Sequence, residues 1–250
     1  MKISSNCYAV TGLYYLPPWT LNAGFIVGKN KTLVIDSGSN KLSAQTIYGY
    51  ARAVRPENEI LLVNTEKHLD HIGGNRYFYE KKAEILGHKA IQRTQNEFLK
   101  SVRFINDSLF HPVRKNLNEG FYAFEKTEIM NPIHLIDKNI EIDLGNFSAQ
   151  IILTPGHTDS NLCVYHQDDK VLYSGDMILS QFVPNLEEGG QKEWKAWLTS
   201  LEKIKSLDIE IVVTGHGEVI LGKADIEKEI GRIEKILFKA IQDDKAPTVM

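Results

Sequence analysis

The chain has 250 residues, a formal net charge of −3, 42% hydrophobic residues and 24% charged residues. A chain of this length can bury a substantial core without disulfides or a structural metal, and its composition is that of a globular rather than a disordered protein. The net charge, together with the lack of a long Lys/Arg run, argues against a nucleic-acid binder, which needs a concentrated basic surface.

The N-terminal segment Met1–Asn6 carries no apolar stretch followed by a small-residue cleavage site. No later window has the apolar length that is needed to cross a bilayer. Cys7 and Cys163 are the only cysteines, so a disulfide framework is not expected, and both are interpreted as small buried hydrophobic residues. We therefore expect a cytoplasmic protein that does not associate with a membrane.

Short apolar runs bounded by turn residues predict strands. In chain order they are Gly24–Gly28, Thr32–Asp36, Ile60–Asn64, Ile140–Asp143, Ala149–Leu153, Leu162–His166, Val171–Ser174 and Ile209–Thr214. Helical spacing predicts helices at Leu42–Val54, Gly74–Lys81, Lys192–Ser206 and Ala224–Asp243. No repeat, low-complexity stretch or linker interrupts this order, so residues 1–250 are expected to form one domain. The order of the elements favours an α/β or α+β layered sandwich.

Residues 90–130 have a different pattern, in which aromatic and aliphatic residues alternate irregularly with charges and His111-Pro112 interrupts the helical spacing. This pattern predicts an irregular helical insertion between two strand-rich halves. Such an insertion is either a lid over a substrate site or a helical pair that only packs on the sheet.

The densest chemical signal directly follows the predicted strand Ile60–Asn64. Four potential metal ligands stand within six residues: Glu66, His68, Asp70 and His71. A loop at a strand end can turn these side chains toward one point, and oxygen and imidazole ligands suit zinc, manganese or iron. Considered alone, the same cluster could also be a solvated polar loop.

Three further predicted strands end in a residue of the same kind. His157 follows Thr154-Pro155-Gly156, Asp176 follows Gly175, and His216 stands between two glycines. A histidine or carboxylate at the ends of four separate strands is difficult to obtain by chance. The sequence therefore predicts a site that these strand ends build together.

This set of motifs resembles the metallo-β-lactamase superfamily, whose signature is a His-x-His-x-Asp-His loop, a later Gly-His, a Gly-Asp and a Gly-His-Gly. The resemblance extends from Asn22–Val27 and Val34–Gly38, which are similar to the opening hairpin of the family, to Thr214–Gly217. It implies a four-layer αβ/βα sandwich. The motifs are specific for the fold but only weakly specific for the substrate, because the family carries out many reactions.

The resemblance also implies a set of ligands for two metal ions. One ion would be held by Glu66, His68 and His157, and the other by Asp70, His71 and His216, with Asp176 between them. Asp36 would form hydrogen bonds near the metal loop without binding metal. Two Zn²⁺ ions per chain are expected, with iron or manganese as alternatives.

Glu66 departs from the family pattern, which has histidine at the first position of the loop. Three carboxylates against two divalent cations reduce the formal charge of the site to +1, so a bound water should be acidified less. Glu66 would then weaken activity, shift the metal preference toward harder ions, or rotate away and leave one metal. Flavodiiron proteins carry their glutamate at the second loop position, where this chain has His68, which counts against diiron electron transfer.

Other titratable and aromatic residues lack such motifs. His88, near a strand end, either lines the site or lies at the surface. Three isolated histidines are assigned structural or solvated roles: His111, His134 and His166. Three aromatic residues before the opening strand either form an apolar substrate wall or pack in an ordinary way: Tyr14, Tyr15 and Trp19.

The function that the resemblance implies is hydrolysis. A metal-bound hydroxide, oriented by the catalytic residues Asp70 and Asp176, would cleave a small ester, thioester, lactone or β-lactam. A Gly-x-Ser-x-Gly nucleophile motif is absent from the sequence. Two alternatives stay open, namely an iron-dependent dioxygenase acting on a persulfide and a non-catalytic binder that kept the fold. The expected partner is a small-molecule substrate, and the chain is expected to be a monomer or homodimer.

Overall fold

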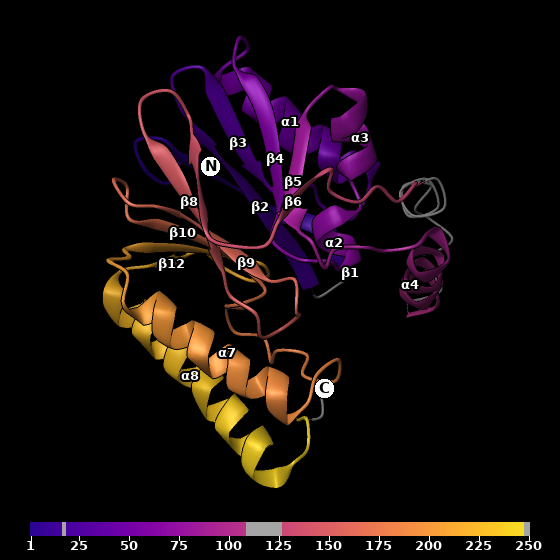
Figure 1. The fold of residues 1–250 in the computed structure, drawn as a ribbon, viewed down its shortest axis with the longest axis vertical. Helices are drawn as coiled ribbons and strands as arrows, with labels where there is room; N and C mark the ends of the chain where they lie inside the picture. The colour runs from indigo at the N-terminus through magenta and orange to yellow at the C-terminus, as the bar shows by residue number, and fades with distance from the viewer. Residues whose placement is uncertain (17–18, 109–126, 248–250) are drawn as a thin grey trace.

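The structure is a computed structural model that describes residues 1–16, 19–108 and 127–247, and the side chains of residues 14–19 and 102–108 are left undescribed. The described residues form two six-stranded sheets that pack face to face (Figure 1). The first sheet has the strand order β1 (Cys7–Leu16), β2 (Trp19–Val27), β3 (Lys31–Ile35), β4 (Glu59–Asn64), β5 (Glu84–His88) and β6 (His134–Ile136). Strands β1, β2 and β3 pair antiparallel, and β3 to β6 pair parallel.

The second sheet is mostly antiparallel. Its order is β12 (Ile220–Leu221), β11 (Ile211–Thr214), β10 (Val171–Gly175), β9 (Leu162–His166), β8 (Ser148–Leu153) and β7 (Ile140–Asp143). Strands β10 and β11 pair parallel. Because β8 and β10 are both antiparallel to β9, strands β8, β10 and β11 all run in one direction.

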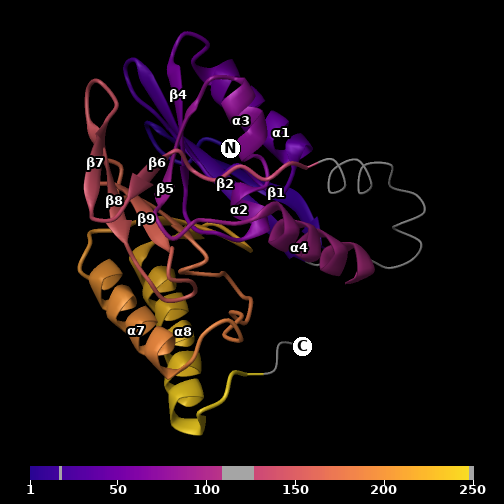
Figure 2. The ribbon, with the colours of Figure 1, turned by 45° about the vertical axis from the view of Figure 1, so that its right-hand side comes forward.

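Helices cover the outer faces of both sheets (Figure 2). Helices α1 (Lys41–Val54) and α3 (Asn75–Glu80) lie on the first sheet, and α7 (Gln191–Lys205) and α8 (Lys223–Asp243) lie on the second. The short helix α2 (Leu69–Ile72) follows β4, and α4 (Gln95–Ser108) projects beside it. The layers therefore run helices, sheet, sheet, helices, which confirms the expected αβ/βα sandwich.

Alternation along the strands explains why both faces of each sheet are buried. In β4, Leu61 and Val63 contribute to the core between the sheets, whereas Ile60 and Leu62 contribute to the core beneath α1. Successive side chains of a strand point to opposite faces, so a continuous apolar run fits a strand covered on both sides. The stripe of α8 packs on the second sheet in the same way, with Ile226, Ile230, Ile233 and Leu237 buried.

One tyrosine ties the two sheets together across the central core. The Tyr173 hydroxyl of β10 donates to the Tyr8 carbonyl at 3.1 Å and accepts from the Tyr8 amide at 3.2 Å. Gly24 makes room for the ring, because a Cβ at this position would lie 2.3 Å from Tyr173 Cε1. This contact aligns β10 with the opening hairpin of β1 and β2.

The predicted elements need several corrections. Strand β2 begins at Trp19 rather than Gly24, and β11 begins at Ile211 rather than Ile209. Strands β1, β5, β6 and β12 were not predicted. A register shift between Val10 and Leu13 breaks the alternation of β1, and the three-residue edge strand β6 leaves two of its side chains exposed.

Helix α4 lies within the predicted insertion at residues 90–130, and residues 109–126 of that insertion lie outside the described residues. Its role as a lid stays a prediction. None of the helices in the described part of the chain is both long and apolar enough to span a membrane.

Candidate metal centre

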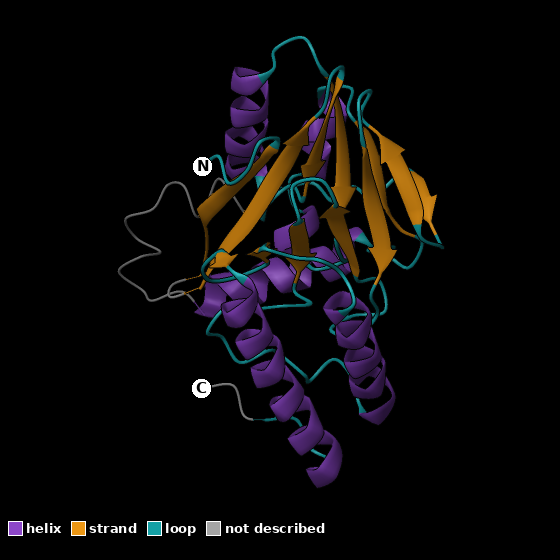
Figure 3. Ribbon diagram, turned by 90° about the vertical axis from the view of Figure 1, so that its left-hand side faces the viewer, coloured by secondary structure: helices purple, strands orange, loops and turns teal. Residues whose placement is uncertain are grey.

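The carboxyl ends of strands from both sheets meet at one edge of the sandwich (Figure 3). Strands β3 and β4 end there in the first sheet, and β8, β10 and β11 end there in the second. Asn22 of β2 joins the two rims, because its amide donates to the Gly215 carbonyl at 2.8 Å and its Nδ2 donates to the carbonyls of Thr214 at 3.0 Å and Gly217 at 2.9 Å. Side chains that directly follow these strands are therefore held close together.

All seven predicted ligands lie at this edge, in two groups of residues. The first ligand group is Glu66, His68 and His157, and the second ligand group is Asp70, His71, Asp176 and His216. In the first ligand group, Glu66 Oε1 lies 2.6 Å from His68 Nδ1 and 3.6 Å from His157 Nε2. The two imidazole nitrogens lie 3.2 Å apart, so three potential ligand atoms face one point.

The second ligand group is equally close. Asp70 Oδ2 lies 3.0 Å from His216 Nε2 and 3.6 Å from His71 Nε2. Asp176 Oδ1 lies 3.3 Å from His71 Nε2, and Asp176 Oδ2 lies 3.4 Å from His216 Nε2. The carboxylate of Asp176 also reaches the first ligand group, at 3.6 Å from His157 Nε2. Asp176 thus lies between the groups, as the family resemblance implied.

Glu66 contacts both groups as well, which was not foreseen. Its Oε1 lies 3.3 Å from His71 Nε2 of the second ligand group, and the whole side chain is buried. The proposed rotation of Glu66 away from the site is not what the structure shows. The carboxylate is directed into the centre and lies between His68 and His71.

Hydrogen bonds on the far sides of the rings fix which nitrogen faces the centre. Asp36 Oδ2 lies 2.9 Å from His71 Nδ1, and the Thr20 carbonyl lies 2.9 Å from His216 Nδ1. Each acceptor favours a proton on Nδ1 and leaves the Nε2 lone pair directed inward. For His68 the arrangement is reversed, because Glu188 Oε1 lies 3.0 Å from Nε2 and the Nδ1 atom faces inward.

Asp36 supports the second ligand group from within the core. Its two carboxylate oxygens accept from the Thr65 amide and the Thr65 hydroxyl, each at 2.7 Å. The backbone of Asp36 has a φ of 63°, in the left-handed region that non-glycine residues rarely adopt. Asp36 therefore occupies the position beside the metal loop that the resemblance implied, and it contacts His71 without entering either ligand group.

Opposite charges dominate the electrostatics of the centre. Burial opposes ionisation of Asp70, but His71 and His216 outweigh it and lower the pKa of Asp70 to about 2. Burial likewise opposes protonation of His68, but Glu66 and Glu188 raise the pKa of His68 to about 10. The pKa of Asp176 is held well below its usual range by His216 and His71 despite burial. The carboxylates are therefore ionised at neutral pH, and metal must displace protons from the histidines.

Sequence reasoning missed Glu188. Glu188 lies in the loop before α7 and is partly exposed. Its Oε1 atom accepts from Nε2 of His68, which lies in the loop after β4. The only signal in the sequence is a pair of glutamates, Glu187 and Glu188, and such pairs are common on protein surfaces. Only the folded arrangement brings this loop against the metal loop.

The remaining candidates lie elsewhere. The half-buried His88 accepts from the Ala90 amide through Nδ1 at 3.2 Å, and the exposed His134 lies 4.0 Å from Glu84. Neither belongs to a ligand group. His111 and the side chains of Tyr14, Tyr15 and Trp19 fall outside the described residues.

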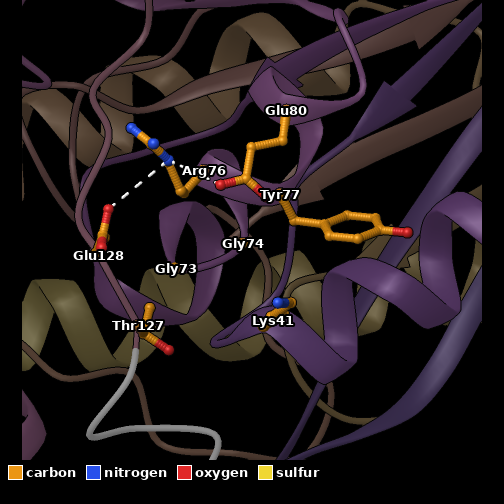
Figure 4. A pocket seen from close by; sticks show the side chains of 8 residues that line it. All are labelled: Lys41, Gly73, Gly74, Arg76, Tyr77, Glu80, Thr127 and Glu128. Carbon is orange, nitrogen blue, oxygen red and sulfur yellow. Dashed lines mark hydrogen bonds and ion pairs between the residues drawn. The ribbon is translucent and has the colours of Figure 1, made fainter.

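A pocket of about 130 Å³ lies along α3, where Gly73, Gly74 and Arg76 are among its lining residues (Figure 4). None of the seven candidate ligands lines it. Its most prominent charge, Arg76, is already paired with Glu80 at 3.1 Å and with Glu128 at 3.7 Å. The pocket is therefore not the place where the ligand chemistry of this chain is concentrated.

Comparisons with known proteins agree with this geometry. A profile of the metallo-beta-lactamase superfamily matches residues 16–216. A beta-lactamase-like protein 2 homolog of Caenorhabditis elegans is 26% identical over 243 residues, covering 93% of this chain and 70% of the worm protein. An acyl-coenzyme A thioesterase of Gallus gallus is 24% identical over 233 residues, covering 88% of this chain and 77% of the avian protein.

Solved structures show the same architecture. A metallo-beta-lactamase from Pontibacter korlensis superposes with a TM-score of 0.69 at 16% identity, covering 95% of this chain and 97% of that one. At this identity the likeness concerns the fold alone.

Proposed function

The chain belongs to the metallo-beta-lactamase superfamily and is a metal-dependent hydrolase. We propose that it uses two zinc ions to cleave a small acyl compound, and that an acyl thioester is the preferred substrate. The observation that carries the proposal is the convergence of two complete ligand groups, each with at least three donor atoms, on the buried carboxylates of Glu66 and Asp176.

The donor set fits metal ions. Among the described residues, three buried atoms of the ligand groups have no hydrogen-bond partner: Glu66 Oε2, His71 Nε2 and Asp176 Oδ1, the last two lying 3.3 Å apart. A buried polar atom without a partner costs free energy, and a cation would satisfy all three. Imidazole and carboxylate ligands suit zinc, while iron and manganese accept the same donors. When bound, such ions lower the pKa of a water molecule and polarise a carbonyl oxygen.

The residues of the chain would act on the water and on its proton. Asp176 lies between the two ligand groups, so its carboxylate can orient a water there and accept its proton. Asp70 Oδ2 lies 3.0 Å from His216 Nε2 in the same ligand group, so its carboxylate can share this role. Asp36 and the Thr20 carbonyl hold the outer Nδ1 atoms of His71 and His216, so metal binding would displace the proton from the Nε2 atom of each ring.

Two observations support an acyl thioester. The avian relative is named as an acyl-coenzyme A thioesterase. In addition, the aspartate at position 176 resembles the thioesterase and lactonase branches of the family. One subclass of β-lactamases has a cysteine at this position instead. Esters, lactones and β-lactams remain in the substrate class that the same carboxylate arrangement can hydrolyse.

The decisive test is a substrate panel with metal analysis. The purified protein, loaded with zinc, is assayed against acyl-CoA thioesters, lactones, β-lactams and phosphodiesters, and bound metal is counted by elemental analysis. We expect two zinc ions per chain and the highest kcat/KM for a thioester, lost in Asp176→Asn. A protein that binds zinc but hydrolyses none of the acyl substrates would refute the proposal.

One observation favours a second candidate. Because Glu66 replaces a histidine, the first ligand group is a set of two histidines and one carboxylate, which is the ligand set of non-haem iron oxygenases. An iron-dependent dioxygenase acting on a persulfide therefore remains the alternative. One iron per chain with persulfide-dependent oxygen uptake, and no thioester hydrolysis, would establish it in place of the hydrolase.

A further inference from the structure

A third group of potential ligands lies at the opposite end of the strands from the candidate metal centre. Strand β10 ends at Gly175, beside Asp176, and begins at Val171, which pairs with His166 at the end of β9. Around His166 lie Asp169, in the turn between β9 and β10, and Cys7, at the start of β1. The chain thus brings a sulfur, a nitrogen and an oxygen donor from both sheets to one place.

These three donors are close to one another and shielded from water. One ligand atom of each residue lies within 4.8 Å of the others. Cys7 is 0% exposed and His166 is 1% exposed, and the side chain of Asp169 is 9% exposed. Donors around a tetrahedral zinc lie about 3.6 Å apart, so small side-chain rotations would be sufficient to close the site.

His166 is the residue that ordinary packing leaves unexplained. Both of its ring nitrogens are buried and have no hydrogen-bond partner among the described residues. Its Nε2 atom lies 3.9 Å from Asp169 Oδ2, which is too far for a hydrogen bond. The ring of Phe147 packs against the imidazole at 4.3 Å between centroids and holds it in place. Leaving both nitrogens of a buried imidazole without a partner costs free energy, which a bound ligand would offset.

Asp169, in contrast, is oriented by its surroundings. Its Oδ2 atom accepts from the Ser4 hydroxyl at 2.6 Å and from the Asn6 amide at 2.7 Å. Its Oδ1 atom lies 3.5 Å from Asn6 Nδ2. Carboxylates that bind metal are typically held by hydrogen bonds of this kind, which fix the direction of the free lone pairs.

We propose that Cys7, His166 and Asp169 bind a zinc ion of their own, which ties the N-terminal strand of the first sheet to the β9–β10 hairpin of the second. A thiolate, an imidazole and a carboxylate form a donor set that zinc accepts, with the fourth position left to a water. Binding replaces the S–H bond of Cys7 by an S–Zn bond and releases one proton to solvent.

The site would be structural rather than catalytic. Burial raises the pKa of the Cys7 thiol to about 12, so the metal-free protein keeps this thiol protonated and unreactive. A metal held by residues of both sheets stabilises only the folded arrangement, because the unfolded chain does not hold the three donors together. The site is independent of the proposed hydrolase activity.

Cobalt substitution gives a direct test, because the two ligand groups of the candidate metal centre contain no sulfur. The metal-free 250-residue chain is titrated with Co²⁺, and the near-ultraviolet absorption of a thiolate-to-cobalt charge transfer is recorded. We expect this band in the wild type, in Cys163→Ser, which removes the other buried cysteine, and in Asp70→Asn. The band should be absent from Cys7→Ser.

A band that is missing from the wild type, or that persists in Cys7→Ser, would overturn the proposal. Circular dichroism establishes whether each variant is folded. If Cys7→Ser does not fold, Asp169→Asn carries the test: its band should require on the order of 10–100-fold more Co²⁺ than the wild type needs. An unchanged Co²⁺ requirement in Asp169→Asn would also overturn the proposal.

Discussion

The two ligand groups of the candidate metal centre are held in different ways. The second ligand group rests on the core, because His71 is fixed by the buried Asp36, which is itself fixed by Thr65. In the first ligand group Glu66 and His157 are buried as well, but His68 is fixed from the surface by Glu188, whose side chain is 45% exposed. The support of His71 is therefore part of the buried fold, whereas the support of His68 comes from an exposed side chain in a loop.

Removing a carboxylate of the second ligand group should have the largest effect. Asp70→Asn removes a charged ligand that lies 3.0 Å from His216, and we expect kcat/KM to fall about 10²–10⁴-fold. Steady-state kinetics with the best substrate of the panel measure this loss. Full activity in Asp70→Asn would show that the second ligand group does not take part in the reaction.

The support of the second ligand group should matter next. Asp36→Asn keeps the shape of the side chain but weakens the hydrogen bond to His71 Nδ1, so zinc affinity at this position should fall about 10–100-fold. Competition with a chromophoric chelator resolves the two zinc ions. If both ions were weakened equally, the proposed separation between a core-held and a surface-held position would be wrong.

Disturbing the support of the first ligand group should have a smaller effect, because solvent screens the exposed glutamate. Glu188→Gln should weaken one zinc ion about tenfold and leave the other unchanged. Glu187→Gln is the matched control, since Glu187 is its exposed neighbour in the same loop. Equal zinc affinities in the two variants would show that Glu188 does not support the first ligand group.

The smallest expected signal is the proton balance of metal uptake. The pKa of His68 is raised to about 10 by Glu66 and Glu188, although burial opposes this. The metal-free protein therefore carries a proton on His68 at about pH 8, and metal binding must release it, so affinity should rise with pH. Calorimetry in two buffers of different ionisation enthalpy counts the protons. Uptake without proton release in the wild type would exclude His68 as a ligand.

Much of this arrangement could be predicted because strand ends carry strong local signals. Glu66, His157, Asp176 and His216 each follow an apolar run closely, and this pattern alone predicts that they meet at the ends of the strands. Asp36 was implied by the family resemblance in the same way.

What could not be predicted depends on contacts between distant segments without a motif. Glu188 reaches His68 from a loop that has no periodic pattern, and nothing in the sequence near His166 indicates that Cys7 lies beside it. Strand β1 escaped prediction because its register shift at Val10–Leu13 interrupts the alternation on which strand prediction depends.

The hydrogen bonds of Asn22 affect how the protein would lose a bound metal. Asn22 of the first sheet forms hydrogen bonds to the loop of the second sheet that carries His216. A displacement of the sheets by one residue, roughly 3.3 Å, would break these bonds and move the His216 imidazole away from Asp70. The geometry of the candidate metal centre therefore depends on how the two sheets are aligned. When the two sheets are displaced relative to each other, bound metal should be released before the helices that cover the sheets unfold.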